Sequence, residues 1–323
     1  MIKHKYTTNQ FILGIIFILS GFGVVVMYSA SSIIAMNQFN NYQHFFTQQM
    51  KWLFVGFFLM FIISKANYRI FKEYAYHLLF LSWIVLFMGY FFKSPNNDAS
   101  RWLFIGGRSW MTTSDLARVS LLIFTSFFIE KHKSNLNDYK FLLLRFTPYF
   151  STSLILILFQ PDTSTAIMIA SIIMIMLFIS GTDYRYLVTI SSLGFIGLIY
   201  KIIITPHALA RIINWNDEQK IQSLNALGSG GILGTGLGDS IIKNGFLPQS
   251  HTDFILPIIG EELGFIGILI IFTLFWLLFN KGIWVVKEAP DLFSMLLSFG
   301  IISSIIIYFL VNAAYVVGFA PTT

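Results

Sequence analysis

Residues 255–279 read ILPIIGEELGFIGILIIFTLFWLLF, an apolar stretch whose only ionisable residues are Glu261 and Glu262. A helix that spans a membrane needs about 20 predominantly apolar residues, so this stretch is long enough to cross one. Its apolar residues do not alternate with polar ones, which favours a helix over a strand of a membrane barrel. Ionisable residues at this depth are costly and usually face a bundle interior or a cavity. The stretch therefore predicts a spanning helix with a polar site inside it.

Eight further apolar stretches lie along the chain, and the composition agrees with residence in a membrane. Of the 323 residues, 56% are hydrophobic and 11% are charged, whereas a soluble domain carries about 25% charged residues. We predict an all-α fold, one domain over residues 1–323 that forms a polytopic membrane helix bundle. The nine predicted spans are 11–35, 47–64, 76–93, 114–130, 143–159, 163–180, 186–204, 255–279 and 292–317.

The basic residues predict the orientation of these spans. Lysine and arginine concentrate in cytoplasmic loops, and a cytoplasmic N-terminus places most of the 21 lysines and arginines in short internal loops. Two long external loops result, 94–113 and 205–254, and the larger one joins the seventh and eighth helices. The chain has no cysteine, which excludes disulfides, thiolate metal sites and a cysteine nucleophile.

The external loop 205–254 is rich in glycine. Six glycines lie within residues 228–238, and such a run permits tight turns and lets backbone N–H groups approach an anion closely. A flexible or re-entrant surface loop explains the glycines equally well. No nucleotide-binding glycine motif is present.

Asp253 is the strongest single candidate for chemistry. It lies at the external mouth of the eighth helix, where a carboxylate can act as a general base. The alternative is that Ser250, Thr252 or Asp253 only caps the helix. With 3.6 residues per turn, Asp253 and Glu261 point within about 80° of each other and could line one cleft.

Other polar residues admit two interpretations each. Asp115 and Arg118 are i, i+3 neighbours, and a structural ion pair is favoured over a substrate contact. Arg101 either binds phosphate or anchors the membrane interface beside Trp102. Of the six histidines only His251 lies beside other candidates, and metal-ligand spacing is absent, so no metal site is expected.

Several short motifs occur together in these segments. They are QSL at 222–224, GSGG at 228–231, GLG at 236–238 followed by Ser240 and Lys243, HTDF at 251–254, GEELG at 260–264, and the supporting motifs RW at 101–102, SDLAR at 114–118 and QPD at 160–162. Together they closely resemble the SEDS family (shape, elongation, division and sporulation), which has ten transmembrane helices. The glycine motif is more similar to the division branch, FtsW, than to the elongation branch, RodA.

The resemblance implies a peptidoglycan glycosyltransferase at the outer face of the cell (inner) membrane, at the division septum. Its substrate would be lipid II, the undecaprenyl-diphosphate-linked disaccharide peptide. Its partners would be a class B penicillin-binding transpeptidase and other divisome membrane proteins, with no nucleic acid. The family's essential aspartate matches Asp253, and no cofactor is identified beyond an optional divalent cation. The substrate contacts expected beside it are Arg101, Lys243, Gln222, Ser223, Gly228, Gly230, His251 and Glu261.

The sequence departs from the family in three places. Gln249 replaces an acidic residue, the segment after Trp215 is several residues shorter, and the chain stops at Thr323, before the family's last loop and tenth helix. We therefore expect a chain that inserts into the membrane but polymerises glycan poorly or not at all. A flippase for the same lipid precursor and a non-catalytic scaffold for the transpeptidase are the alternative functions.

Overall fold

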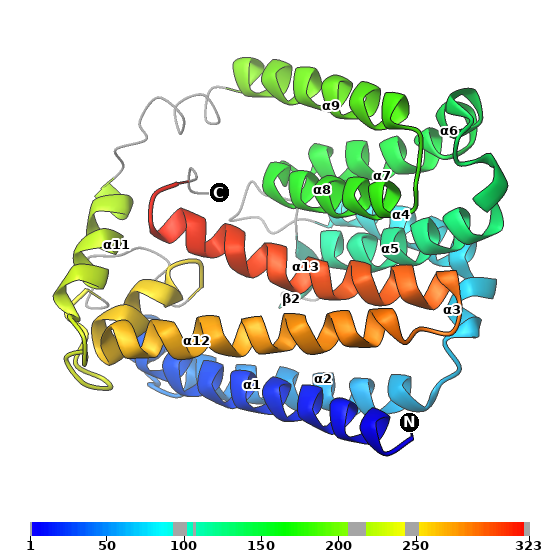
Figure 1. The fold of residues 1–323 in the computed structure, drawn as a ribbon. Coiled ribbons are helices and arrows are strands. Elements are labelled where there is room, and N and C mark those ends of the chain that lie inside the picture. Colours follow the sequence, from blue (N-terminus) through cyan, green and yellow to red (C-terminus); the bar gives the residue numbers. More distant parts are fainter. Residues whose placement is uncertain (1, 93–101, 106–107, 206–217, 243–251, 320–323) are drawn as a thin grey trace. The chain divides into compact units, whose positions relative to one another are not determined.

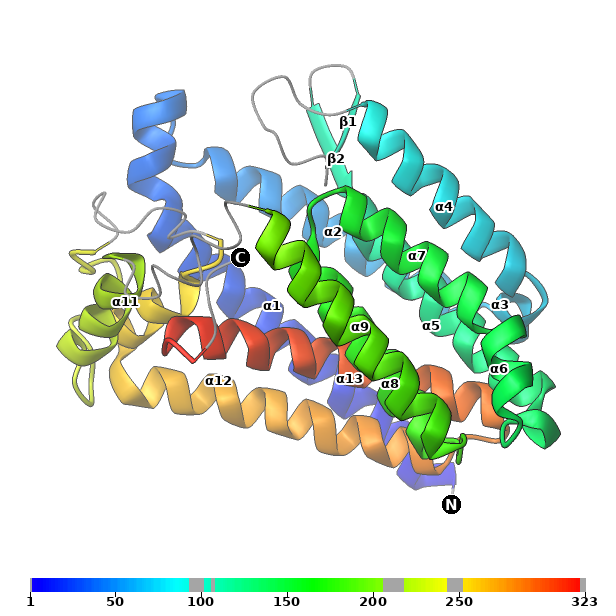
Figure 2. The same ribbon diagram turned by 90° about the horizontal axis from the view of Figure 1, so that it is seen from above.

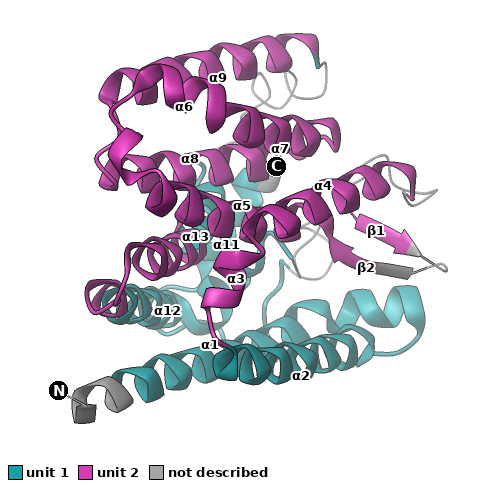
Figure 3. Cartoon of the chain, turned by 90° about the vertical axis from the view of Figure 1, so that its right-hand side faces the viewer, with its two compact units in different colours: residues 1–66, 205–282, 308–323 teal, residues 67–204, 283–307 magenta. Residues whose placement is uncertain are grey.

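The computed structural model describes residues 2–92, 102–105, 108–205, 218–242 and 252–319, and most of them are helical (Figure 1). The chain forms two compact units (Figure 3). The first unit comprises residues 1–66, 205–282 and 308–323. The second comprises residues 67–204 and 283–307.

The first unit contains the helices that surround the predicted site. Its elements are α1 (Ile2–Phe39), α2 (His44–Lys65), α11 (Glu218–Ser229), most of α12 (Ile255–Lys287) and the end of α13 (Leu292–Val316). Its core brings Val26 of α1 together with Phe254 and Ile259 and with Val316 of α13. Burial of these apolar side chains links the start of α12 to helices from both ends of the sequence.

The second unit is a helix bundle with an aromatic core. Besides the end of α12 and most of α13, its elements are α3 (Arg69–Glu73), α4 (Ala75–Phe91), β1 (Trp102–Ile105), β2 (Arg108–Thr112), α5 (Thr113–Lys131), the 3-10 helix η1 (Lys133–Asn135), α6 (Tyr139–Arg145), α7 (Thr147–Phe159), α8 (Thr163–Ile179) and α9 (Tyr184–Ile204). Phe124 and Phe128 of α5 pack against Phe146 and Ile172. Helices α4, α5 and α7 run side by side in this unit (Figure 2).

Each of the nine predicted spans coincides with a helical segment of the structure. By length and composition five described helices can cross a membrane, namely α1, α2, α9, α12 and α13. The predicted span 143–159 is bent by 46° between α6 and α7, and this pair makes a sixth candidate. Helices α4 and α8 are apolar but shorter, at 17 residues each. The helical membrane fold is confirmed.

Two segments predicted as loops contain regular structure. Strands β1 and β2 form an antiparallel hairpin in which Trp102 pairs with Thr112, inside the predicted loop 94–113. The aromatic residues of this segment favour strands. Helix α11 lies within the predicted loop 205–254. One of its faces, with Ser223 and Ala226, is buried, whereas Leu224 is exposed. The eighth helix also continues eight residues past its predicted end at 279, to Lys287.

Candidate active site

The candidate site is built around a break in α12. Gly264 has φ 65° and ψ −163°, a conformation far from helical. In a continuous helix the N–H of residue i donates to the carbonyl of residue i−4. Phe265 and Ile266 would then donate to Glu261 and Glu262, but the turn at Gly264 directs both N–H groups to other acceptors. Two carbonyls and two N–H groups inside an apolar helix therefore need new partners.

The glycine-rich loop after α11 supplies all four partners. Thr235 N donates to Glu261 O at 2.9 Å and Gly236 N donates to Glu262 O at 3.0 Å. In the other direction, the Phe265 N–H donates to Gly231 O at 2.9 Å. The Ile266 N–H donates to Ile232 O at 3.3 Å. The loop thus replaces the two hydrogen bonds that Phe265 and Ile266 would make in a continuous helix.

This contact requires glycine on both sides. A Cβ on Gly234 would lie 2.2 Å from Glu262 O, and one on Gly230 would lie 1.9 Å from Gly260 O. A Cβ on Gly264 would lie 2.4 Å from Gly234 N. Helix α11 and this loop lie beside the first turns of α12 (Figures 1 and 2). The glycines allow backbone to meet backbone, and the amides of residues 234–236 are used inside the protein rather than left for an anion.

The two glutamates of α12 also bind protein groups. Glu261 is 2% exposed, and its carboxylate accepts hydrogen bonds from the Ser240 hydroxyl and, at 3.0 Å, from the Ile241 N–H. Glu262 accepts a hydrogen bond from the Ser29 hydroxyl of α1 at 2.6 Å. This geometry favours a structural role for Glu261 over the substrate contact expected from the sequence.

Asp253 lies in the turn that precedes α12, two residues before the helix begins at Ile255. Its side chain is exposed, whereas the next residue, Phe254, is buried in the core of the first unit. The Asn312 side-chain amide of α13 donates to the Asp253 carbonyl oxygen at 3.0 Å. The turn is therefore anchored on both sides, while Asp253 itself is exposed. Sequence reasoning missed Asn312, for which the only signal is a polar residue within an apolar helix.

Helix α11 is attached to the end of α13. Ser223 is fully buried, and its hydroxyl donates to the Val316 carbonyl at 2.9 Å. The Gln222 side-chain oxygen is buried with no hydrogen-bond partner among the described residues. A Cβ on Gly228 would meet no atom within 4 Å. Ser223 thus has a structural contact, and substrate binding by Gln222 and Gly228 stays a prediction.

Three expected substrate contacts, Arg101, Lys243 and His251, lie outside the residues that the structure describes. Among the described residues no group of three histidine, aspartate or glutamate side chains is placed to hold a metal ion.

Two of the supporting motifs, at 114–118 and 160–162, contact each other in the second unit. The Ser114 hydroxyl donates to Asp162 at 2.9 Å, and the Thr113 hydroxyl donates to the Gln160 side chain at 2.7 Å. The expected ion pair is also present, since Arg118 Nη2 lies 3.0 Å from Asp115 Oδ1. The polar residues at the start of α5 are therefore paired within the protein.

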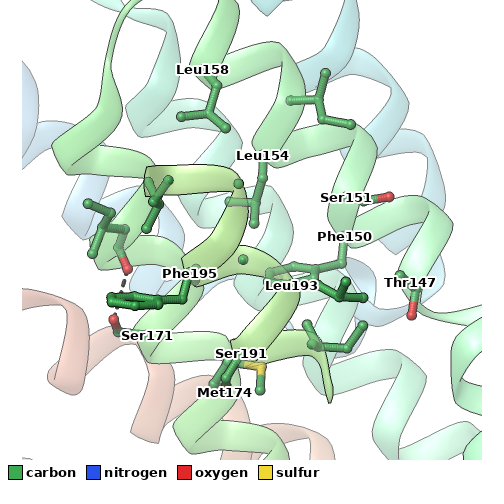
Figure 4. A pocket seen from close by; sticks show the side chains of 17 residues that line it. Thr147, Phe150, Ser151, Leu154, Leu158, Ser171, Met174, Ser191, Leu193 and Phe195 are labelled. Carbon is green, nitrogen blue, oxygen red and sulfur yellow. Dashed lines mark hydrogen bonds between the residues drawn. The ribbon is translucent and has the colours of Figure 1, made fainter. Parts of the chain in front are cut away.

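The second unit also carries an apolar groove of about 560 Å³ between α7, α8 and α9 (Figure 4). The hydroxyls of Ser151 and Ser171, which line it, donate to backbone carbonyls of their own helices. No ionisable side chain lines the groove. It includes none of the predicted site residues and offers no group for acid–base chemistry.

The helices and the broken-helix site define a polytopic α-helical membrane protein. A sequence profile of the FtsW/RodA/SpoVE family, described as a cell cycle protein family, matches residues 9–323. The chain belongs to this family.

Individual relatives agree with this membership. The chain is 34% identical over 320 residues to a probable peptidoglycan glycosyltransferase FtsW of Geobacter sulfurreducens, covering 94% of this chain and 84% of the relative. It is 30% identical to the stage V sporulation protein E of Bacillus subtilis, covering 99% of this chain and 90% of the relative.

Solved structures share the fold at lower identity. A chain of a peptidoglycan synthase complex that coordinates polymerization and crosslinking aligns with a TM-score of 0.73 at 20% identity, covering 96% of this chain and 88% of that one. The rod shape-determining protein RodA of Thermus thermophilus aligns with a TM-score of 0.66 at 20% identity, covering 94% of this chain and 84% of that one.

Proposed function

We propose that this chain is a peptidoglycan glycosyltransferase that polymerises lipid II into glycan strands at the outer face of the cytoplasmic membrane, during septal wall synthesis. Family membership over residues 9–323 and relatives named as peptidoglycan glycosyltransferases support the activity. The structural observation that carries it is Asp253, an exposed carboxylate on a turn anchored by Phe254 and Asn312.

The proposed reaction joins two sugars with loss of a lipid diphosphate. A sugar hydroxyl of one chain attacks the anomeric carbon of another, the new C–O bond forms, and the bond from that carbon to the diphosphate oxygen breaks. Asp253 accepts the hydroxyl proton, since an uncharged hydroxyl is a poor nucleophile at neutral pH. The departing diphosphate needs cationic or N–H donors, for which Arg101 and Lys243 have the required charge. Gln222 and His251 are further side chains proposed beside them.

The geometry narrows the proposed substrate contacts. The loop amides of residues 234–236 and the Glu261 carboxylate bind protein groups, so they are omitted from the diphosphate site. The donors we retain for the diphosphate are side chains.

We also propose a cytoplasmic N-terminus and location at the division septum, with a class B transpeptidase and other divisome membrane proteins as partners. The distribution of lysine and arginine supports the orientation. The structural relative found within a synthase complex that coordinates polymerization and crosslinking supports a transpeptidase partner.

The activity is tested by incubating purified protein, alone and with its transpeptidase, with lipid II. Asp253→Asn keeps the size of the side chain but loses the base, so glycan synthesis should fall about 100-fold or more. Asp239→Asn, at another exposed acidic residue of the same loop, is the control and should retain activity. A parallel reaction with a chelator tests for a divalent cation. Polymerisation by Asp253→Asn at the wild-type rate would overturn Asp253 as the base, and no polymerisation by the wild type under any of these conditions would overturn the activity.

The orientation is tested by thiol labelling of intact spheroplasts. The chain has no cysteine, so Ser229→Cys and Asn135→Cys each introduce a single thiol. A membrane-impermeant reagent should label the cysteine at position 229 and spare the one at 135. The reverse pattern would invert the topology.

A further inference from the structure

Asn312 is a polar side chain in an otherwise apolar helix. Helix α13 reads LFSMLLSFGIISSIIIYFLVNAAYV over Leu292–Val316, with no charged residue and a single side-chain amide, that of Asn312. A polar group among apolar ones is stabilised by a hydrogen-bond partner. The Asn312 amide donates to the backbone carbonyl of Asp253 at 3.0 Å, across 59 positions of the chain, and both residues belong to the first unit. The amide of α13 thus contacts the turn that carries the proposed base.

This contact restricts where the Asp253 side chain can lie. A donor on its carbonyl oxygen fixes the peptide plane that follows Asp253, and the next residue, Phe254, is 4% exposed in the core of the unit. Once this backbone is fixed, the carboxylate can occupy only the positions that its side-chain rotamers allow. A misplacement of about 1 Å at a catalytic group can lower a rate by roughly 100-fold. The position of the base therefore depends on a helix that lies far along the chain.

The same end of α13 also holds helix α11. The Val316 carbonyl, four positions after Asn312, accepts a hydrogen bond from the buried Ser223 hydroxyl at 2.9 Å. Residues four positions apart lie one above the other on a helix. Gln222, a proposed substrate contact, directly precedes Ser223. The last turns of α13 therefore join the turn that carries the proposed base to the helix that carries a proposed substrate contact.

We infer that Asn312 is a positioning residue: its amide holds the turn of Asp253 against the end of α13, to which α11 is also attached. This inference rests on the proposed function for its kinetic consequence and on the described contact for its structural one. Because Asn312 acts through the backbone of Asp253, it should affect the chemical step and not the affinity for lipid II.

The kinetic test separates kcat from KM for lipid II. Asn312→Leu keeps a similar side-chain size but removes the donor, so kcat should fall about tenfold while KM stays within about twofold of the wild type. Asn312→Gln keeps an amide on a longer side chain and should retain several-fold more of kcat than Asn312→Leu. Asn280→Ala is the matched control, because the Asn280 amide also donates to a backbone carbonyl in the first unit, that of Trp276 within α12. It should leave both constants unchanged.

The structural test does not depend on catalysis. Mass spectrometry measures hydrogen exchange of the backbone amides in the first turns of α12, residues 255–260, for the wild type and each variant in detergent. Asn312→Leu should raise this exchange rate several-fold, because the turn before the helix loses a contact, whereas Asn280→Ala should not. Thermal unfolding of the same samples shows which variants are folded. If Asn312→Leu does not fold, Asn312→Ala removes the same donor with a smaller change.

Three results would each overturn the inference for a folded variant that lacks the amide. The first is a wild-type exchange rate, and the second is a wild-type kcat, which would make the contact one of stability alone. The third is a raised KM with unchanged kcat, which would assign Asn312 to the substrate itself. If the wild type does not polymerise lipid II, the proposed function fails, while the exchange rates still decide the contact.

Discussion

The two units place polar residues among apolar helices in different ways. In the second unit, Ser114 and Asp162 lie at the starts of two helices and bind each other side chain to side chain. In the first unit, the helix itself is broken at Gly264, and a loop backbone satisfies the exposed carbonyls and N–H groups. The first arrangement leaves the helices intact, whereas the second separates the first turns of α12, which follow the exposed Asp253, from the rest of the helix. Polar groups can therefore be satisfied among apolar helices either by side-chain pairs at helix ends or by a loop backbone at a break.

The largest stability effect is expected at the break. Gly264→Ala forces a side chain into a left-handed φ of 65° and against the backbone of Gly234. The strain and the clash together should cost about 2–6 kcal/mol of unfolding free energy. Thermal unfolding in detergent measures the loss. Gly228→Ala, where a Cβ meets nothing within 4 Å, is the control and should be neutral or stabilising. Equal stability of the two variants would contradict the broken-helix contact.

The buried pair of the second unit should show a smaller effect, confined to stability. Asp162→Ala leaves the Ser114 hydroxyl without its partner and removes the acceptor for the Thr165 N–H at the start of α8. We expect a loss of about 1–3 kcal/mol with unchanged activity per folded molecule. Asp138→Ala, at an exposed cap of α6, is the matched control for capping alone. A folded but inactive Asp162→Ala protein would indicate that the Ser114–Asp162 pair takes part in the reaction.

The ion pair at the start of α5 should contribute less. The Asp115 and Arg118 side chains are 50% and 23% exposed, so water screens their attraction. Neutralising either one should lower the unfolding free energy by up to about 1 kcal/mol. The exchange Asp115→Arg with Arg118→Asp should recover part of that loss. A fully stable single variant that is inactive would indicate a substrate contact instead.

The smallest effect is expected at the loop between α12 and α13. Burial alone would raise the pKa of Asp291, but hydrogen bonds from Ser294 and Tyr68 and the charge of Lys72 lower it overall. A lowered pKa means that Asp291 stabilises the fold above the unfolded pKa, about 3.9, and that this stability is lost as pH falls through the folded value. At pH 7 the wild type should unfold at a higher temperature than Asp291→Asn, and this difference should become smaller in acid. A difference in unfolding temperature that becomes larger in acid would contradict a lowered pKa of Asp291.

Part of the site was predictable because it depends on local sequence. Asp253 was found from its place beside an apolar stretch, and the Asp115–Arg118 pair from helical spacing of three residues. Other contacts were not predictable, because their partners are far apart in the chain. Ser29 and Glu262 are 233 positions apart, and Asp253 and Asn312 are 59 positions apart.

The sequence alone determined that this chain is an all-α membrane protein with its spans near their observed positions, because burial in lipid demands long apolar helices whatever their packing. The glycines of residues 228–238 indicated that this segment can make tight turns. What the glycines do depends on the tertiary structure. The glycines permit a close backbone contact with the break at Gly264, and Glu261 turns to Ser240 rather than outward. The physical reason is that an apolar helix cannot leave its backbone groups unpaired, and which segment pairs with them depends on three-dimensional proximity.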